Sequence, residues 1–197
     1  MSDWCTTDYV LQGPVEKIEK FNNDLTQLWN KAQQQESEEA PSHTHALPLE
    51  AIQRGLLSHL YDSSATIRGT LTDYNGNIQA TTAQNAFIRL TTETLWCPCY
   101  ELMLQLALTY HLQLYYYAEE PNSSLYETND SEGTFFPIRY KLSSEERNDY
   151  FVTFEELAQA VEQVTGTYTE QEDELIDAVD EYNANTGYLS VNAIQVV

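Results

Sequence analysis

The chain contains three cysteines, and two of them, Cys97 and Cys99, flank a single proline. Thiols that hold zinc or exchange disulfides are typically spaced Cys-x-x-Cys, and a structural zinc site has four protein ligands. The spacing here does not fit that pattern, and Cys5 is the one other thiol in the sequence. We therefore expect three free thiols and no bound metal or other cofactor. His43 and His45 lie in a Gln/Ser/Glu-rich stretch where nothing would hold them in place as ligands.

A second group of residues combines aromatic rings with carboxylates near the end of a tyrosine-rich run. Adjacent carboxylates can act as a general acid and base when burial separates their pKa values, and exposed rings on a sheet can stack on a peptide or a base. The sequence places no histidine or other nucleophile beside them. Two interpretations are open: packing in the core, or a groove of an enzyme or of a small-ligand or peptide-binding domain. The members of this group are Trp4, Trp96, Tyr115, Tyr117, Glu119 and Glu120.

The strongest compositional signal is negative charge. The chain has 31 acids and 9 bases among its 197 residues, a net charge of −22. From Leu142 to the C-terminus there are thirteen acids and one base, Arg147. A field of this sign repels nucleic acids and anionic membranes and attracts basic protein surfaces. We therefore expect a protein partner with a basic surface, and no direct binding of nucleic acid.

Six of these acids fall on one side of a predicted helix at about 100° per residue, opposite Leu175, Ile176, Val179 and Tyr182. They are Glu170, Asp173, Glu174, Asp177, Asp180 and Glu181. One charge about every 3 Å of helix is close to the ~3.4 Å spacing of phosphates along one DNA strand. The stripe is open to two interpretations, a solvated helix face or a functional acidic surface that imitates a phosphate backbone.

Hydrophobic periodicity predicts the elements that must position these residues. The expected strands are 5–11, 66–72, 86–94 and 112–118, with shorter ones at 125–126, 135–140 and 188–197. Helices are expected to begin at Pro14, Pro48 and Pro98. Two more should follow Thr153 and Thr169, because each begins a Thr-x-x-Glu capping box.

This order is strand, helix, inserted helix, two strands, helix, strand, which is the β-α-β-β-α-β order of a ferredoxin-like sheet. We predict an α+β fold with a ferredoxin-like antiparallel sheet over residues 1–142 and a loop-and-helix insertion at 33–62. Residues 143–197 are expected to form an acidic, α-rich segment that ends in a short strand and packs on the same domain.

Several motifs carry a family resemblance. They are Asp3-Trp4-Cys5-Thr6 followed by Leu11-Gln12-Gly13-Pro14, then Glu93-Thr94-Leu95-Trp96-Cys97-Pro98, and segments between Ala118 and Pro137. Over residues 1–142 the chain resembles the YubB-like proteins, which are uncharacterised and borne by plasmids and phages, in a variant typical of gut Bacteroidetes. The resemblance implies a ferredoxin-like fold and a mobile-element setting. Cys97 and Cys99 stand where that family usually has Ser and Pro, and the resemblance brings no catalytic residue.

The N-terminus has neither the basic nor the apolar region of a secretion signal, and the longest apolar stretch, Leu102–Leu108, is far below the ~20 residues of a membrane span. We expect a cytoplasmic location. Our functional hypothesis is a non-enzymatic protein-binding module that uses its acidic surface, in its narrowest form a DNA mimic through which a mobile element opposes a DNA-binding or defence protein of its host. The competing hypothesis is an enzyme or ligand-binding domain built on the aromatic–carboxylate group. No residue pattern indicates the oligomeric state.

Overall fold

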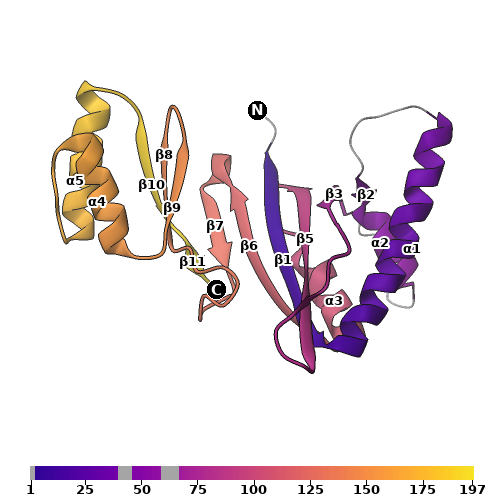
Figure 1. The fold of residues 1–197 in the computed structure, drawn as a ribbon. Coiled ribbons are helices and arrows are strands. Elements are labelled where there is room, and N and C mark those ends of the chain that lie inside the picture. The colour runs from indigo at the N-terminus through magenta and orange to yellow at the C-terminus, as the bar shows by residue number, and fades with distance from the viewer. Residues whose placement is uncertain (1–2, 40–45, 59–66) are drawn as a thin grey trace. The chain divides into compact units, whose positions relative to one another are not determined.

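The computed structural model describes residues 3–39, 46–58 and 67–197, and of residues 35–39 it describes the backbone course only (Figure 1). The chain is an α+β protein with five α-helices in its described part and a large, mostly antiparallel sheet. It divides into two compact units, which we call unit 1 (residues 1–125) and unit 2 (residues 126–197). No helix among the described residues is both long enough and apolar enough to cross a membrane.

The sheet of unit 1 is built around strand β1. Its strand order is β6-β1-β5-β3-β2, every neighbouring pair is antiparallel, and the short strand β4 adds a further pairing to β5. The strands are β1 (Trp4–Pro14), β2 (Leu47–Pro48), β3 (Gly69–Asp73), β4 (Gln79–Ala80), β5 (Asn85–Leu95) and β6 (Gln113–Glu120). The predicted strands 5–11 and 112–118 therefore lie side by side in one sheet.

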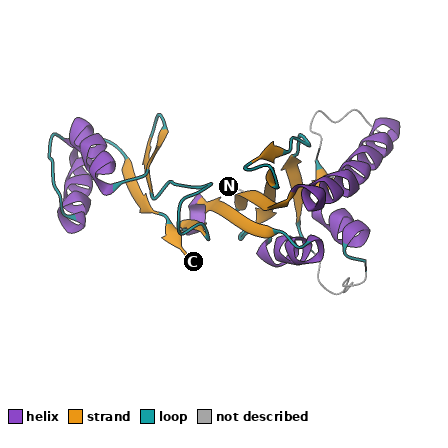
Figure 2. Cartoon of the chain, turned by 60° about the horizontal axis from the view of Figure 1, so that its bottom comes forward, coloured by secondary structure: helices purple, strands orange, loops and turns teal. Residues whose placement is uncertain are grey.

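One face of this sheet carries the core of unit 1. Alternation in β1 buries Cys5, Tyr9 and Leu11, as expected for a strand with one face against a core. Three helices cover this face (Figure 2): α1 (Val15–Glu39), α2 (Leu49–Leu56) and α3 (Tyr100–Tyr110). Apolar residues of α1 at three- and four-residue spacing, including Ile18 and Phe21, belong to the same buried cluster as the strands.

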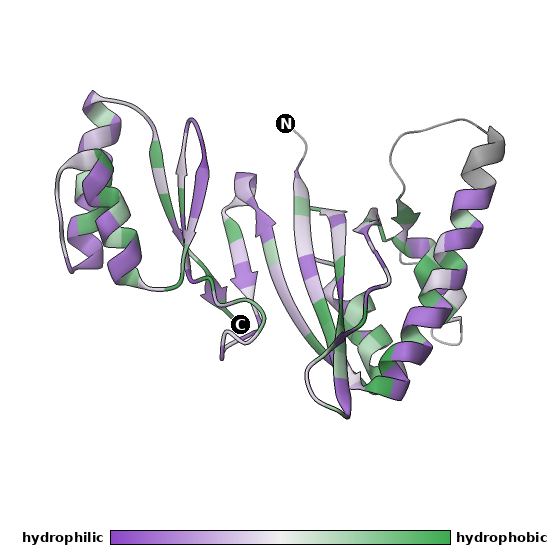
Figure 3. Ribbon diagram, viewed as in Figure 1, coloured by the Kyte–Doolittle hydropathy of each residue, from purple (hydrophilic) through white to green (hydrophobic). Residues whose placement is uncertain are grey.

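Unit 2 contains a three-stranded antiparallel sheet with the order β10-β8-β9. These strands are β8 (Tyr140–Ser144), β9 (Asn148–Phe151) and β10 (Leu189–Ala193), while the short strand β7 (Leu125–Thr128) pairs in parallel with β11 (Gln195–Val196). Helices α4 (Phe154–Thr165) and α5 (Glu172–Asn185) are amphipathic and carry both hydrophobic and hydrophilic residues (Figure 3). Their apolar residues Leu157, Val161 and Leu175 pack in one buried cluster with Leu142 and Leu189 of the sheet.

Asp130 organises the loop between β7 and β8. Its buried carboxylate accepts hydrogen bonds from the backbone N–H groups of Thr134 (3.1 Å), Phe135 (2.6 Å) and Phe136 (2.8 Å). Burial by itself would raise the pKa of Asp130, but these N–H groups outweigh it and lower the pKa below its ordinary value. The carboxylate thus takes the N–H groups of Phe135 and Phe136, and Pro137 has no N–H to offer. Residues 135–139 form no strand, so our prediction of a strand at 135–140 is wrong except for Tyr140, where β8 begins.

The boundaries of two other predicted segments also differ from the prediction. The predicted division at residue 142 falls in the middle of β8. In the structure, the first compact unit ends at Leu125 and the second begins at Tyr126. Within the predicted insertion at 33–62, α1 continues to Glu39 and α2 ends at Leu56. Residues 40–45, which include His43 and His45, and residues 59–66 lie outside the described part of the chain.

One of the two predicted capping boxes is formed. The Thr153 hydroxyl accepts from the Glu156 N–H at 3.3 Å, and the Glu156 carboxylate accepts from the Thr153 N–H at 3.1 Å, so that α4 starts at Phe154. The second is not formed: α5 is capped by Gln171, whose side chain makes no capping bond, and the Thr169 hydroxyl donates to the Glu174 carboxylate at 2.7 Å instead.

The two helix starts give a matched test of this difference. Replacing Thr153 by Ala should lower the free energy of unfolding by about 1 kcal/mol, because it leaves the Glu156 N–H of α4 without its acceptor. Replacing Gln171 by Ala should change it by less than about 0.5 kcal/mol, as for other exposed positions without a specific contact. Urea unfolding followed by circular dichroism measures both, and equal losses would contradict the assignment of the cap.

Candidate functional site

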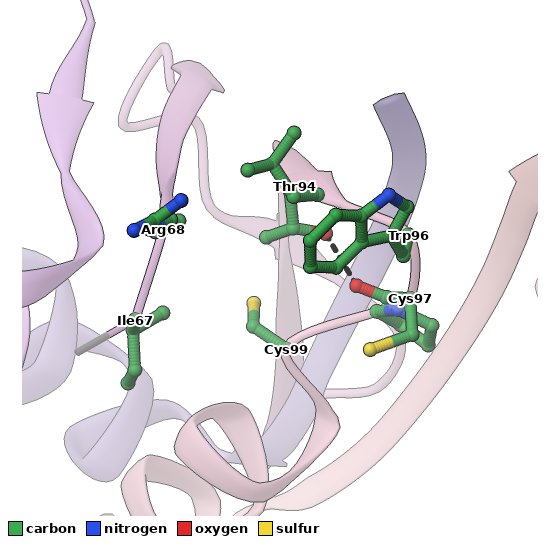
Figure 4. A pocket seen from close by; sticks show the side chains of 8 residues that line it. Ile67, Arg68, Thr94, Trp96, Cys97 and Cys99 are labelled. Carbon is green, nitrogen blue, oxygen red and sulfur yellow. Dashed lines mark hydrogen bonds between the residues drawn. The ribbon is translucent and has the colours of Figure 1, made fainter. Parts of the chain in front are cut away.

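A pocket of about 320 Å³ lies between the end of β5 and the start of α3 in unit 1 (Figure 4). It is lined by Ile67, Arg68, Thr94, Leu95, Trp96, Cys97, Pro98 and Cys99. Most of these side chains are apolar, and Arg68 is the one that carries a charge. In Figure 4 the Cys99 thiol points into the space between Arg68 on one side and Trp96 on the other.

Gly69 brings Arg68 to this pocket. A Cβ atom at position 69 would lie 2.5 Å from the Glu93 carbonyl oxygen and 2.6 Å from the Thr94 methyl group, so only glycine allows the chain to approach β5 this closely. The Arg68 carbonyl accepts a hydrogen bond from the Leu95 N–H at 3.3 Å. The backbone before β3 is thus fixed against the end of β5, and the Arg68 side chain lies at the rim of the pocket.

Trp96 forms the opposite wall in an unusual conformation. Its φ angle is +69°, in the left-handed region that a bulky residue rarely adopts, which costs on the order of 1–3 kcal/mol. Two hydrogen bonds to Asp3 hold it there, from the Trp96 N–H to the Asp3 carbonyl at 2.8 Å and from the indole N–H to the Asp3 carboxylate at 3.2 Å. The ring is nevertheless 61% exposed. The local structure therefore holds a large apolar ring out of the core.

The three cysteines are free thiols in three different environments. Cys5 is fully buried, and burial raises its pKa to about 11. Burial also raises the pKa of Cys99, whose sulfur lies 3.6 Å from the Tyr9 hydroxyl and 3.8 Å from the Thr92 hydroxyl. Cys97 is exposed. Among the described residues, no three His, Cys, Asp or Glu side chains cluster in a way that could hold a metal ion.

The structure brings together only part of the predicted aromatic–carboxylate group. Glu119 and Glu120 are neighbours in a strand, so their side chains point to opposite faces of the sheet. Glu119 accepts a hydrogen bond from the Tyr117 hydroxyl. Glu120 is buried, and its carboxylate caps the short 3₁₀ helix η1 (Pro121–Ser123) by accepting from two backbone N–H groups. The two carboxylates therefore do not form the acid–base pair considered from the sequence.

Trp96 lies apart from the other three aromatic residues of the group. Trp4, Tyr115 and Tyr117 share the face of the sheet opposite the helices, since Tyr117 pairs with Asp8 and Tyr115 with Val10 in the register of β1. The pocket at Trp96 is lined by none of these three residues and by neither glutamate. Sequence reasoning missed Arg68, whose place at the pocket depends on the contact of Gly69 with β5, far away in the sequence.

The acidic stripe lies in unit 2. Five of its members belong to α5, and Glu170 lies before the start of that helix. All six are exposed, namely Glu170, Asp173, Glu174, Asp177, Asp180 and Glu181, and we call this set the acidic face. On the other side of α5, Leu175 and Val179 are buried and Tyr182 is half-buried. Ile176 is 46% exposed and is therefore not buried with them.

The acidic face has few balancing charges. From Phe154 to the C-terminus there are ten acids and neither lysine nor arginine, and all ten acids are exposed. Among the described residues, ion pairs such as Lys17–Glu16, Arg54–Glu50 and Arg147–Asp149 include none of these ten acids. A small pocket of about 280 Å³, lined by Phe154, Glu155, Tyr168 and Glu170, opens beside the acidic face.

Comparison of this chain with models of known protein families, with curated proteins and with solved structures finds no match. What this protein does must therefore be inferred from the two sites themselves.

The environments of the thiols predict a graded reactivity. With iodoacetamide at neutral pH, Cys97 should be alkylated quickly, Cys99 more slowly because its pKa is raised although it lines the pocket, and Cys5 only after unfolding, since the thiolate is the nucleophile and burial suppresses it. Mass spectrometry of peptides after timed quenching follows each site. Cys97→Ser should remove the fast phase and leave the others unchanged, and rapid alkylation of Cys5 in the folded protein would contradict the structure.

Proposed function

We propose that this protein is a non-enzymatic binding module that uses the acidic face of unit 2 to bind a basic surface of another protein. The observation that carries the proposal is the run of ten exposed acids after Arg147 without one lysine or arginine among them. An isolated surface charge attracts a partner weakly, but several charges of one sign on one surface raise the rate of encounter and select against acidic partners.

The spacing of the acids supports a narrower form of the proposal, in which the acidic face imitates a DNA backbone. Within α5, five acids from Asp173 to Glu181 span about 12 Å, or one charge per ~3 Å, against ~3.4 Å for the phosphates of one strand. A DNA-binding protein, including one that defends a bacterial host against mobile elements, would have the complementary surface. The binding needs no cofactor.

The architecture supports a ferredoxin-like assignment of unit 1. With the short strands β2 and β4 left aside, the sheet order β6-β1-β5-β3 corresponds to 4-1-3-2 in chain order, and all three pairings are antiparallel. We take this arrangement, together with the sequence motifs of residues 1–142, as support for kinship with the YubB-like proteins. On that view the acidic unit 2 is the part that differs and that recognises the partner.

Neutralising part of the acidic face tests the proposal. Replacing Asp173, Asp177 and Asp180 together by Asn should slow association with the partner several-fold in low salt and flatten its salt dependence, because long-range attraction scales with charge and is screened within about 8 Å at physiological ionic strength. A matched control replaces Glu16, Glu19 and Glu101, which are exposed acids of unit 1, by Gln. The control changes the total charge equally but leaves the acidic face intact.

The measurement begins with protein captured by the immobilised wild type from a bacterial extract, followed by on-rates for each purified captured protein. The proposal expects a basic protein that the control retains and the Asn variant does not. Duplex DNA should displace it if the acidic face imitates DNA, and should have no effect if the face binds a basic surface of another kind. Equal on-rates for wild type, control and Asn variant would show that the acidic face is only solvated.

A further inference from the structure

We propose that the Trp96 pocket of unit 1 binds a small organic anion, namely a carboxylate attached to an aromatic or similarly flat apolar group. This site is separate from the acidic face, and it would stand if the proposed protein binding failed. Its volume of about 320 Å³ is at the lower end of the range for small-molecule sites, so the ligand is a compact molecule and not a polymer.

The apolar part of the ligand would lie against Trp96. Large rings are normally buried, and this one is held 61% exposed by two hydrogen bonds to Asp3 although its backbone conformation is unfavourable. Ile67, Leu95 and Pro98 supply further apolar wall. A flat apolar group placed there would cover the exposed face of the indole and remove it from water.

The anionic part of the ligand would pair with Arg68. The guanidinium is exposed at the rim of the pocket, and none of the ion pairs found in the described ranges includes it. Its planar fork of N–H donors fits a carboxylate with two parallel hydrogen bonds. The Thr94 hydroxyl and the Cys99 thiol are already engaged, since the hydroxyl donates to the Cys97 carbonyl at 2.6 Å and the thiol contacts Tyr9 and Thr92.

Charge should decide the selectivity of this pocket. The protein as a whole has a net charge of −22 and therefore repels anions, so an anion binds only where a nearby cation offsets the repulsion. Arg68 is the cation placed to do so in this pocket. A neutral ligand of the same shape would gain the contact with Trp96 without the charge-assisted hydrogen bonds.

Phenylacetate and its neutral amide, phenylacetamide, are a matched pair of probes. Binding to the full chain can be followed by shifts of backbone amide signals in two-dimensional NMR. We expect saturable shifts at residues 94–99 with phenylacetate, and affinity for phenylacetamide weaker by about tenfold, as for loss of a hydrogen bond to a charged group.

Three variants locate the interaction. Arg68→Gln should weaken phenylacetate binding about tenfold and leave phenylacetamide unchanged, whereas Arg54→Gln, at an exposed arginine paired with Glu50 in the same unit, should change neither. Trp96→Gly should weaken both probes, and it should fold, because glycine adopts positive φ without strain. The proposal is overturned if phenylacetate gives no saturable shifts at residues 94–99, or if Arg68→Gln binds it as tightly as the wild type.

Discussion

The structure of unit 1 depends on the register of one strand. β1 pairs with β5 from Trp4 to Pro14 and with β6 from Thr6 to Gln12. Successive side chains of a strand point to opposite faces, so this double pairing decides for three strands at once which residues enter the core and which remain on the other face. A slip of one residue would bring Asp8 into the core and Tyr9 out of it, which the burial of an apolar face does not allow.

This register decides which of the reactive residues are buried in the core and which remain accessible for binding. It separates Glu119 from Glu120, which removes a carboxylate pair, and it places Cys5 in the core, where burial suppresses its reactivity. What remains for binding lies where the pairing ends: the Trp96 pocket follows β5 directly, and Arg68 comes just before β3. Unit 2 offers a different chemistry, because its α5 buries Leu175 and Val179 and exposes five acids of the acidic face.

Much of this could be predicted from the sequence, because local patterns determine it. Alternation identified β1, β5 and β6, and Thr153 marked the start of α4. The predictions that were wrong or missing concern contacts between residues far apart in the sequence, or a backbone conformation whose energetic cost cannot be read from the residue type. Asp130 accepts hydrogen bonds from backbone N–H groups of a segment whose sequence resembles a strand. Arg68 lies at the pocket because Gly69, the next residue, packs closely against β5. The positive φ of Trp96 cannot be predicted from the residue type.

A disulfide cross-link measures the register of β1 directly. Gln12 and Gln113 are partners in the β1–β6 pairing and lie at the opposite end of β1 from Cys5. Directly opposite residues of antiparallel strands are within the 4.4–6.8 Å between Cα atoms that a disulfide requires. On mild oxidation, the variant with both Gln12→Cys and Gln113→Cys should form the cross-link, detected by peptide mass spectrometry, while Gln12→Cys with Leu114→Cys should not. Efficient cross-linking of the second pair instead would mean that β1 and β6 pair in another register, and the assignment of residues to the two faces would be wrong.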